Sequence, residues 1–321
     1  MEVSPGFLDV SRRAVGVKNT MTSYDCFRMK GLDLIQRAQP LGPGLFIALR
    51  EIGVGVVIDG IPRYHQANRR NMQRGCVLCV GMAVVAELGP GVSGFAVGDE
   101  VIGFSMRRSS HAEYVAVPAN QLTPRPAKVP WEVAGSLFVA GVTAYAAVQA
   151  VHLVPGDTVV IAGAAGGVGS IAVQLARRVG ATVLGIAGPS NDAWLADHGV
   201  VPVNYSDNLP ARLRAAARSG HIDALLDFFG GGYVAMAVGD LKLSPDKVDT
   251  IADFEAVKRF GVQSKGGADA ATAAVLAELA ELIARGELEV PIAGVFALDD
   301  VRDAFRQLEL RHTRGKMVLR P

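Results

Sequence analysis

A glycine-rich segment, Ala164–Gly169, carries the residue types in this sequence that are best suited to bind a phosphate. Gly166 lets the backbone approach a phosphate closely, and Gly169 lets a following helix pack on the preceding strand. A helix that starts near Val168 would point free N–H groups and its positive dipole end at the same phosphate. Ala164 stands where the usual fingerprint has its first glycine. The segment predicts a loop for the diphosphate of a dinucleotide, with contacts from Ala165, Gly166, Gly167 and Val168. The alternative is a structural turn without a ligand.

The flanking residues give this loop the strand–turn–helix context that it needs. Thr158–Ala162 is a β-branched run typical of a strand, and Ser170–Val179 reads as a helix that ends at Gly180. Strands and helices then alternate along the chain: we expect strands at 182–186, 200–205, 222–228 and 248–251, and helices at 191–198 and 209–218. Apolar strands that alternate with helices predict an α/β fold with a doubly wound parallel sheet.

The regions on either side of this sheet have a different pattern. Residues 80–122 contain short strands and turns typical of a β-rich, barrel-like domain. Residues 269–285 and 299–312 read as amphipathic helices, and 314–319 as a closing strand. Residues 20–75 are irregular and basic. We therefore divide the chain into 1–122 (first part of a catalytic domain), 123–266 (cofactor-binding domain) and 267–321 (return to the catalytic domain).

The residues after the second strand of the sheet bear on the type of dinucleotide. A site for NAD usually has Asp or Glu there, which bonds the ribose 2′-OH, but Leu184–Asn191 contains no acid. A site for NADP usually adds Arg or Lys, and neither occurs from Ala181 to Leu209. Asp192 is expected to start a helix. We expect NADPH in preference to NADH, with phosphate or adenosine contacts from Gly188, Ser190, Asn191 and Tyr205.

At this level of detail the sequence resembles a known family. Several segments are similar to the medium-chain dehydrogenase/reductase superfamily, and within it to the zinc-free, zeta-crystallin-like quinone oxidoreductases. The similarity covers the chain from about residue 80 onward and is poor before it. The segments that carry it are 89–99 (GPGVSGFAVGD), 111–115 (HAEYV), 139–145 (VAGVTAY), 164–169 (AAGGVG), 203–205 (VNY) and 314–319 (RGKMVL).

The resemblance implies a GroES-like catalytic domain built from both parts of the chain around a Rossmann domain, with the active site in the cleft between them. It places Thr143 near the nicotinamide, Ala165–Val168 at the diphosphate and Tyr205 near the adenosine phosphate. It also suggests a homodimer. Three departures stand out: Gly55 replaces the usual Asn, 76–82 (CVLCVGM) replaces a Pro and a Gly-acidic pair, and the phosphate loop lacks its frequent Lys.

The metal-binding residues of the zinc-dependent relatives are not evident in this sequence. Three cysteines cannot form a four-cysteine lobe, and Cys76-x-x-Cys79 has no partner pair after it. His111 fits a structural position in its strand. We expect no metal and assign no catalytic acid. A quinone or an enone spreads developing negative charge by conjugation, so it needs less electrophilic help than a simple carbonyl does.

Composition narrows the remaining classes of function. The 321 residues include 32 Lys and Arg against 31 Asp and Glu, for a net charge of +1, which gives no electrostatic support for nucleic-acid binding. The first residues do not form a secretory signal. No Asp, Glu, Lys or Arg lies between Glu132 and Asp157. We expect a buried helix there rather than a membrane span, and a cytoplasmic protein with no membrane partner.

We therefore predict an NADPH-dependent oxidoreductase that transfers hydride to a small-molecule quinone or activated C=C substrate without a metal. Two alternatives stay open. The first is a non-catalytic nucleotide-binding protein, suggested by Gly55 and by the unusual segment 76–82. The second is a nicotinamide-linked alcohol dehydrogenase. The hydride chemistry would come from the cofactor, while the protein supplies orientation and a dry cleft.

Overall fold

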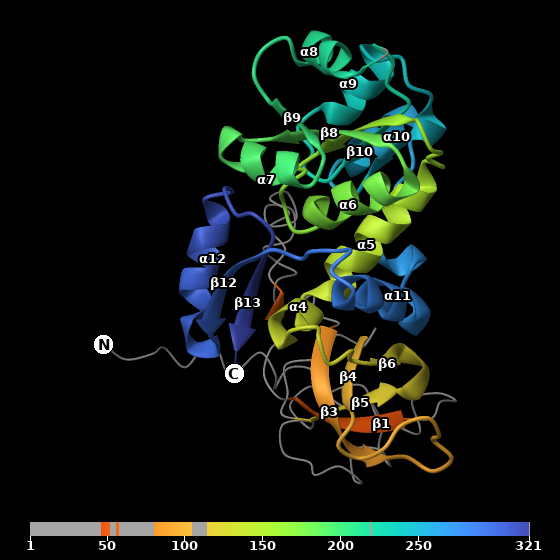
Figure 1. Cartoon of the computed structure of the whole chain (residues 1–321), viewed down its shortest axis with the longest axis vertical. Helices are drawn as coiled ribbons and strands as arrows, with labels where there is room; N and C mark the ends of the chain where they lie inside the picture. Colours follow the sequence, from red (N-terminus) through yellow and green to blue (C-terminus); the bar gives the residue numbers. More distant parts are fainter. Residues whose placement is uncertain (1–45, 52–55, 58–79, 105–113, 219, 321) are drawn as a thin grey trace, which may run out of the picture.

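The middle of the chain forms a five-stranded parallel sheet with the strand order β11-β10-β7-β8-β9 (Figure 1). The structure is a computed structural model that describes residues 46–51, 56–57, 80–104, 114–218 and 220–320. The strands are β7 (Thr158–Ala162), β8 (Thr182–Ala187), β9 (Val201–Asn204), β10 (Ala224–Asp227) and β11 (Val248–Thr250). β7 and β10 are buried along their whole length because helices cover both faces of the sheet. The predicted doubly wound sheet is confirmed.

Two hydrophobic clusters lie on the two faces of this sheet. Val159, Ile161 and Leu226 face one cluster, in which they pack with α5 (Leu137–Ala150), α6 (Gly169–Val179) and α7 (Asp192–Asp197). Val160, Ala162 and Leu225 face the other, in which they pack with α8 (Leu209–Ala216), α9 (Tyr233–Gly239) and α10 (Phe254–Phe260). Alternate residues of each strand thus serve opposite layers, and only the strand ends remain open to a ligand.

A second, antiparallel sheet forms the GroES-like domain, drawn below the parallel sheet in Figure 1. Its strands lie in the order β5-β1-β3-β4-β6. Their bounds are β1 (Phe46–Glu51), β3 (Val80–Leu88), β4 (Glu100–Phe104), β5 (Tyr114–Pro118) and β6 (Leu122–Pro124). The last of these strands spans the predicted boundary at 122/123, and the domain boundaries remain predictions.

The C-terminal part of the chain forms a third sheet together with a short strand from the first part. A three-stranded sheet has the order β12-β13-β2, with β12 (Ile292–Ala297) parallel to β13 (Lys316–Arg320) and β2 (Val56–Val57) antiparallel to it. α12 (Val301–Glu309) connects the two parallel strands. Ahead of them, α11 (Ala273–Ala284) packs against α5, and the hydroxyl of Thr272 caps it by accepting the N–H of Val275.

Several elements differ from those predicted. The helix expected at 191–198 is α7 (Asp192–Asp197), as predicted, but the 3-10 turn η6 (Pro189–Asn191) before it was not, and Pro189 fits the first turn of such a helix. The helix expected at 269–285 begins only after the 3-10 turn η8 (Gly267–Asp269). The short helices α9 and α10 and the strand β12 were not predicted from the sequence.

The charge-free stretch forms α4 (Trp131–Gly135) and α5, which lie one after the other. Trp131–Ala150 is long and apolar enough to cross a membrane by length and composition, with a mean hydropathy of 1.5, but 72% of that window is buried inside the protein. α5 is apolar on all sides because the parallel sheet, α6 and α11 surround it. It is therefore a core helix, as predicted.

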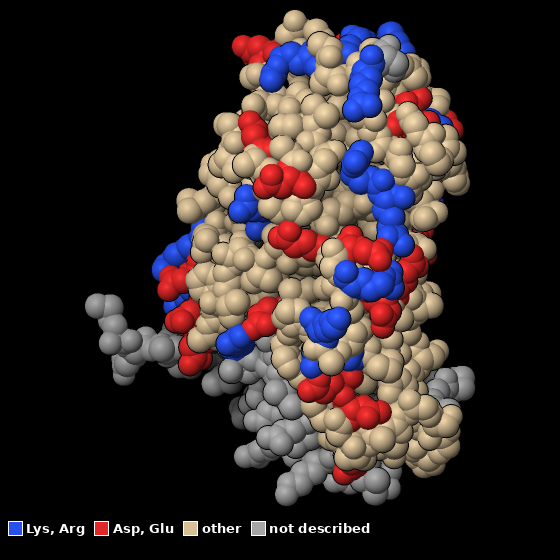
Figure 2. Space-filling model, in the orientation of Figure 1, with Lys and Arg blue, Asp and Glu red and all other residues tan. Residues whose placement is uncertain are grey.

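Basic and acidic side chains are interspersed on the face of the molecule shown in Figure 2. This distribution agrees with the balanced composition, in which the formal net charge is +1. The face drawn there offers no extended patch of one sign that would attract a polyanion.

Candidate functional site

The predicted phosphate loop is a tight turn whose glycines have separate structural reasons. Gly163 has a φ of +74°, a left-handed conformation that glycine adopts without strain. A Cβ on Gly169 would lie 2.1 Å from the carbonyl oxygen of Gly163, so α6 can start this close to β7 only with glycine there. Ala164, which stands where the usual fingerprint has its first glycine, is fully buried, and the positive φ occurs one residue earlier, at Gly163.

Gly166 has more room than the other loop glycines. A Cβ at this position would meet only one atom within 4 Å, the carbonyl oxygen of Gly163 at 3.3 Å. Val168 is the N-cap of α6 and makes no side-chain capping bond. Within the part of the chain that the structure describes, the N–H groups of Gly167 and Val168 donate to no backbone carbonyl. The loop therefore presents bare backbone and unpaired donors at the positive end of a helix.

The loop lies in a cavity of about 460 Å³. Four of the predicted cofactor residues line it, namely Thr143, Gly166, Gly167 and Val168. Ala165 is buried beside the loop, and its carbonyl accepts the N–H of Gly315 at 3.0 Å. Ala165 thus supports the loop from behind instead of facing the cavity. A second cavity, described below, is lined by none of the residues of this loop.

Thr143 forms part of the wall opposite the loop. It lies in the middle of α5 and is 6% exposed. A Cβ built on Gly267 would lie 3.1 Å from the Thr143 hydroxyl oxygen, so η8 packs closely over this threonine. The structure therefore brings Thr143 to the cavity through the packing of α5 against the segment that precedes α11.

The carboxyl ends of β10 and β11 supply an apolar wall, which includes Phe228, Phe229, Ile251 and Phe254. Asp227 holds the turn after β10. Its carboxylate accepts the N–H groups of Phe229 at 3.0 Å and Gly230 at 2.8 Å, and the hydroxyl of Thr250 at 2.9 Å. Burial raises the pKa of Asp227, and these three hydrogen bonds partly offset that rise.

The predicted adenosine residues lie together at the ends of β8 and β9, outside the lining of the cavity. The Tyr205 hydroxyl would be 3.6 Å from a Cβ on Gly188, and the Asn191 amide nitrogen donates to the Gly188 carbonyl at 3.5 Å. Ser190 lies in the intervening turn η6. Tyr205 is 58% exposed, so it is accessible to a ligand. Asp192 begins α7 as expected.

Sequence reasoning missed a contribution from residues 311–316. Arg311, Thr313 and Gly315 line the cavity. Lys316 is 1% exposed, and its Cδ would be 2.7 Å from a Cβ on Gly167. The loop itself lacks a lysine, but β13 places one directly against it. In the sequence, the motif at 314–319 indicates a closing strand and contributes to the family resemblance, but it indicates no contact with the loop. The parallel pairing of β12 with β13 that brings it there leaves no local pattern.

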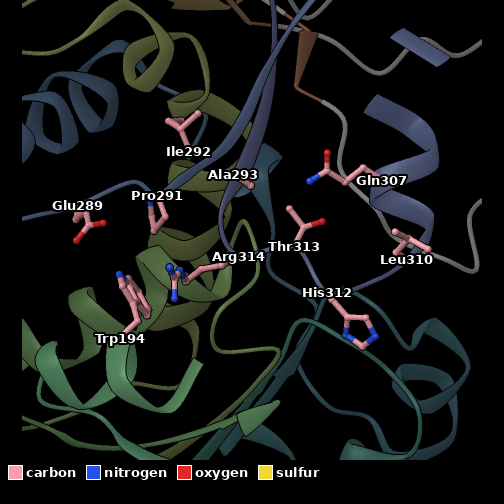
Figure 3. Close-up of a pocket in the computed structure, with 10 residues that line it drawn as sticks. All are labelled: Trp194, Glu289, Pro291, Ile292, Ala293, Gln307, Leu310, His312, Thr313 and Arg314. Carbon is pink, nitrogen blue, oxygen red and sulfur yellow. The ribbon is translucent and has the colours of Figure 1, made fainter. Parts of the chain in front are cut away.

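A second cavity, of about 510 Å³, lies between α7 and the segments before β12 and β13 (Figure 3). Its lining includes Trp194, Glu289, His312 and Arg314 but none of the predicted cofactor residues. Arg314 points toward Trp194, whereas His312 points away from it. Thr313 belongs to both cavities. We assign the candidate cofactor site to the first cavity because the phosphate loop lies there.

No group of three or more His, Cys, Asp or Glu side chains suited to a metal ion occurs among the described residues. Four residues discussed for a metal or for the catalytic strand lie outside the described residues: Cys26, Cys76, Cys79 and His111. Gly55 and the segment 20–75 also lie outside them, apart from 46–51 and 56–57. The expectation that no metal takes part therefore stays a prediction.

Comparison with known proteins agrees with this architecture. Residues 196–319 match a family model described as zinc-binding dehydrogenase. The chain is 29% identical over 276 residues to the synaptic vesicle membrane protein VAT-1 homolog of Homo sapiens, a match that covers 75% of this chain and 70% of that protein. It is also 29% identical over 254 residues to polyketide synthase GfsB of Streptomyces halstedii, but that match spans 74% of this chain and only 4% of the synthase.

Among solved structures, the quinone oxidoreductase from Coxiella burnetii superposes with a TM-score of 0.73. It is 25% identical, and the match covers 86% of this chain and 90% of that one. A Rossmann sheet with a glycine-rich loop, joined to a GroES-like domain, defines an oxidoreductase of the dinucleotide-dependent class. The family model, the VAT-1 homolog and the quinone oxidoreductase structure agree with the resemblance of this chain to the medium-chain dehydrogenase/reductase superfamily and to its zeta-crystallin-like quinone oxidoreductases.

Proposed function

We propose that the protein is an NADPH-dependent reductase that transfers hydride to a quinone or to an activated C=C bond without a metal. The observation that carries this proposal is the cavity of about 460 Å³ in which the phosphate loop, Thr143 and the carboxyl ends of β10 and β11 meet. Ligands of open α/β sheets bind at such strand ends. The likeness to a quinone oxidoreductase supports the choice of acceptor.

The residues present fit a bound dinucleotide. The open space at Gly166 matches the close backbone approach that a diphosphate needs, and the N–H groups of Gly167 and Val168 next to it donate to no backbone carbonyl among the described residues. Thr143 and the wall around Phe228 would then flank the nicotinamide. When bound, the cofactor supplies the hydride, while this chain orients it and excludes water from the cleft.

Two features favour NADPH over NADH. No acid lies at the end of β8 up to Asn191, where a ribose 2′-OH partner is usual. Gly188, Ser190, Asn191 and Tyr205 form a neutral group of hydrogen-bonding side chains and backbone at the end of β8. Such a group accepts a 2′-phosphate more readily than a carboxylate would.

The apolar wall favours a planar, conjugated acceptor. Phe228, Phe229 and Ile251 line the cavity. Asp269, the only carboxylate among the described residues of its lining, accepts the N–H of Gly266 and bonds Lys265. A quinone or enone delocalises the charge that hydride transfer creates, so such a substrate suits a site without a strong electrophile. We propose a homodimer and a cytoplasmic location together with this activity.

The experiment that tests the proposal has two stages. NADPH and NADH are first titrated against the protein by fluorescence, and we expect the tighter binding with NADPH. Oxidation of NADPH is then followed with quinones, α,β-unsaturated ketones and simple ketones, each with added zinc and with a chelator. Turnover with the conjugated acceptors, unchanged by zinc or chelator, is the expected result.

Each alternative has its own outcome in this experiment. NADPH binding without turnover of any acceptor would indicate a non-catalytic nucleotide-binding protein. Alcohol-dependent reduction of NAD or NADP that is lost with the chelator would indicate an alcohol dehydrogenase, which the description of the matching family model favours. The absence of binding to either nucleotide would contradict the whole assignment.

A further inference from the structure

Two fully buried aspartates on neighbouring strands each hold one wall of the candidate cofactor cavity. Asp227 at the end of β10 fixes the turn at 229–230, as described above. Asp249 in β11 is also 0% exposed, and its Oδ1 accepts the backbone N–H of Lys265 at 2.6 Å. Leu226 pairs with Asp249 in the sheet, so the two carboxylates project to opposite faces.

The partner of Asp249 belongs to the segment 264–269, which we call the rim. Ser264, Gly266, Gly267, Ala268 and Asp269 of the rim all line the cavity. The rim packs on Thr143 at Gly267. Within the rim, the N–H of Gly266 donates to Asp269 at 2.9 Å. From the rim to the sheet, the Ser264 hydroxyl donates to the Thr250 carbonyl at 3.0 Å. Asp249 therefore supplies a side-chain bond that ties the rim to the sheet at Lys265, next to the bond from Ser264.

We propose that Asp249 is a positioning residue whose buried carboxyl holds the rim against Thr143 and thereby sets how tightly the cavity binds its dinucleotide. This inference rests on the proposed function, because it takes the cavity to be the cofactor site. Asp249 itself does not line the cavity, so it acts through the backbone of Lys265 rather than by contact with a ligand. The general reason is that a buried acceptor fixes a loop most firmly when its donor has no other partner.

The surroundings of Asp249 give this role a pH dependence. Burial raises the pKa of Asp249 to about 7, Asp269 and Asp227 add to the rise, and Lys265 lowers it. The Oδ2 atom has no hydrogen-bond partner among the described residues. Neither α5 nor α9, which pack on β11, contains an Asp, Glu, Lys or Arg; their titratable groups are the hydroxyls of Tyr145 and Tyr233. An anionic cofactor would favour the protonated carboxyl, so its affinity should fall as pH rises through about 7.

Two substitutions at Asp249 separate the effect of its hydrogen bond to Lys265 from the effect of its charge. Asp249→Asn keeps an oxygen that accepts the Lys265 N–H but does not titrate, whereas Asp249→Ala removes the acceptor. We expect Asp249→Ala to weaken NADPH binding by about tenfold at about pH 6, where the parent carboxyl is mostly protonated, as loss of one buried hydrogen bond implies. At about pH 6, Asp249→Asn should bind NADPH as tightly as the parent does. Between about pH 6 and 8 the affinity of the parent should fall, and that of Asp249→Asn should fall less because residue 249 no longer titrates. Asp246→Asn, at an exposed position before the same strand, is the matched control and should follow the parent.

Fluorescence titration of NADPH and amide exchange at Lys265 in the free protein are the two measurements. Faster exchange at Lys265 in Asp249→Ala, together with weaker binding, is the expected result. Parental affinity and exchange in Asp249→Ala would overturn the inference, as would a parental pH profile in Asp249→Asn. If Asp249→Ala does not fold, the profile of Asp249→Asn decides alone. Failure of the parent to bind NADPH at any pH would instead refute the proposed function.

Discussion

Replacement of Gly166 by valine separates cofactor binding from folding at the phosphate loop. The backbone at Gly166 lies outside the left-handed region, and a Cβ there would meet only the Gly163 carbonyl oxygen, at 3.3 Å. We therefore expect Gly166→Val to fold with a loss of at most about 1 kcal/mol of stability. The branched side chain would project into the space where the diphosphate has to approach the backbone.

The expected effect on binding follows from the hydrogen bonds that this approach allows. The N–H groups of Gly167 and Val168 are two donors without a backbone partner in the described chain. A hydrogen bond to a charged group contributes about 1.5–3 kcal/mol, so loss of both removes roughly 3 kcal/mol or more. At about 1.4 kcal/mol per tenfold, the dissociation constant for NADPH should rise at least about 100-fold. Gly166→Ala should give a smaller loss of affinity.

The assay is fluorescence titration of NADPH, with circular dichroism and thermal unfolding as tests of the fold. Gly169→Ala is the contrasting variant, because its Cβ would lie 2.1 Å from the Gly163 oxygen and 2.9 Å from the Ala164 Cα. We expect this variant to be destabilised, so its affinity for NADPH would not report on the loop alone. A folded Gly166→Val protein that binds NADPH as tightly as the parent would show that the diphosphate does not lie on this loop.

Three further predictions concern the walls of the cavity and the buried carboxylates. Asp227→Ala should lower the free energy of unfolding by roughly 3 kcal/mol or more, because it leaves three donors unpaired; a urea midpoint equal to that of the parent would contradict this. Arg311→Leu should weaken NADPH and NADH alike, by about tenfold, because Arg311 lines the cavity that contains the phosphate loop; two parallel titrations check this, and unchanged affinity for both would exclude a contact with the diphosphate. The folded pKa of Asp249 lies above its ordinary value, so the stability it contributes is fully present below about pH 4 and is lost as pH rises through about 7. Thermal unfolding of Asp249→Asn relative to the parent should therefore improve steadily from pH 4 to 7 and level off above it, whereas a constant difference would place the pKa elsewhere.

The parallel sheet was predictable from the sequence because its signals are local. β-branched runs such as Thr158–Ala162 and helix ends such as Gly180 occur at the predicted places, since burial on both faces makes these strands apolar throughout. The helix expected at 191–198 starts at Asp192, and only the short 3-10 turn that begins at Pro189 was missed. The short helix α9 escaped prediction because Gly230, Gly231 and Gly232 mask its start, and each of these glycines has a positive φ.

The candidate site was only partly predictable, because several of its residues come from distant parts of the chain. The loop at 165–168 has its own motif, and Thr143 follows from the family pattern. No sequence pattern near Asp249 or Lys265 indicates that the Asp249 carboxylate would accept the backbone N–H of Lys265. Arg311 reaches the cavity on the segment that leads into β13, and Lys316 in β13 packs against Gly167. β13 pairs with β12 in parallel, and such a pairing cannot be read from local composition.

The hydrogen bond from Gly315 to Ala165 has a consequence for biogenesis. The loop leaves the ribosome about 150 residues before the segment that supports it. The loop therefore gains its contact with Gly315 only after that distant segment has been synthesised and has docked. A nascent Rossmann sheet can therefore assemble early, yet stay unable to capture its nucleotide until β13 docks. Nucleotide capture should thus report the last stage of maturation, and ribosome-stalled chains that end before residue 315 should have a folded sheet without affinity for the nucleotide.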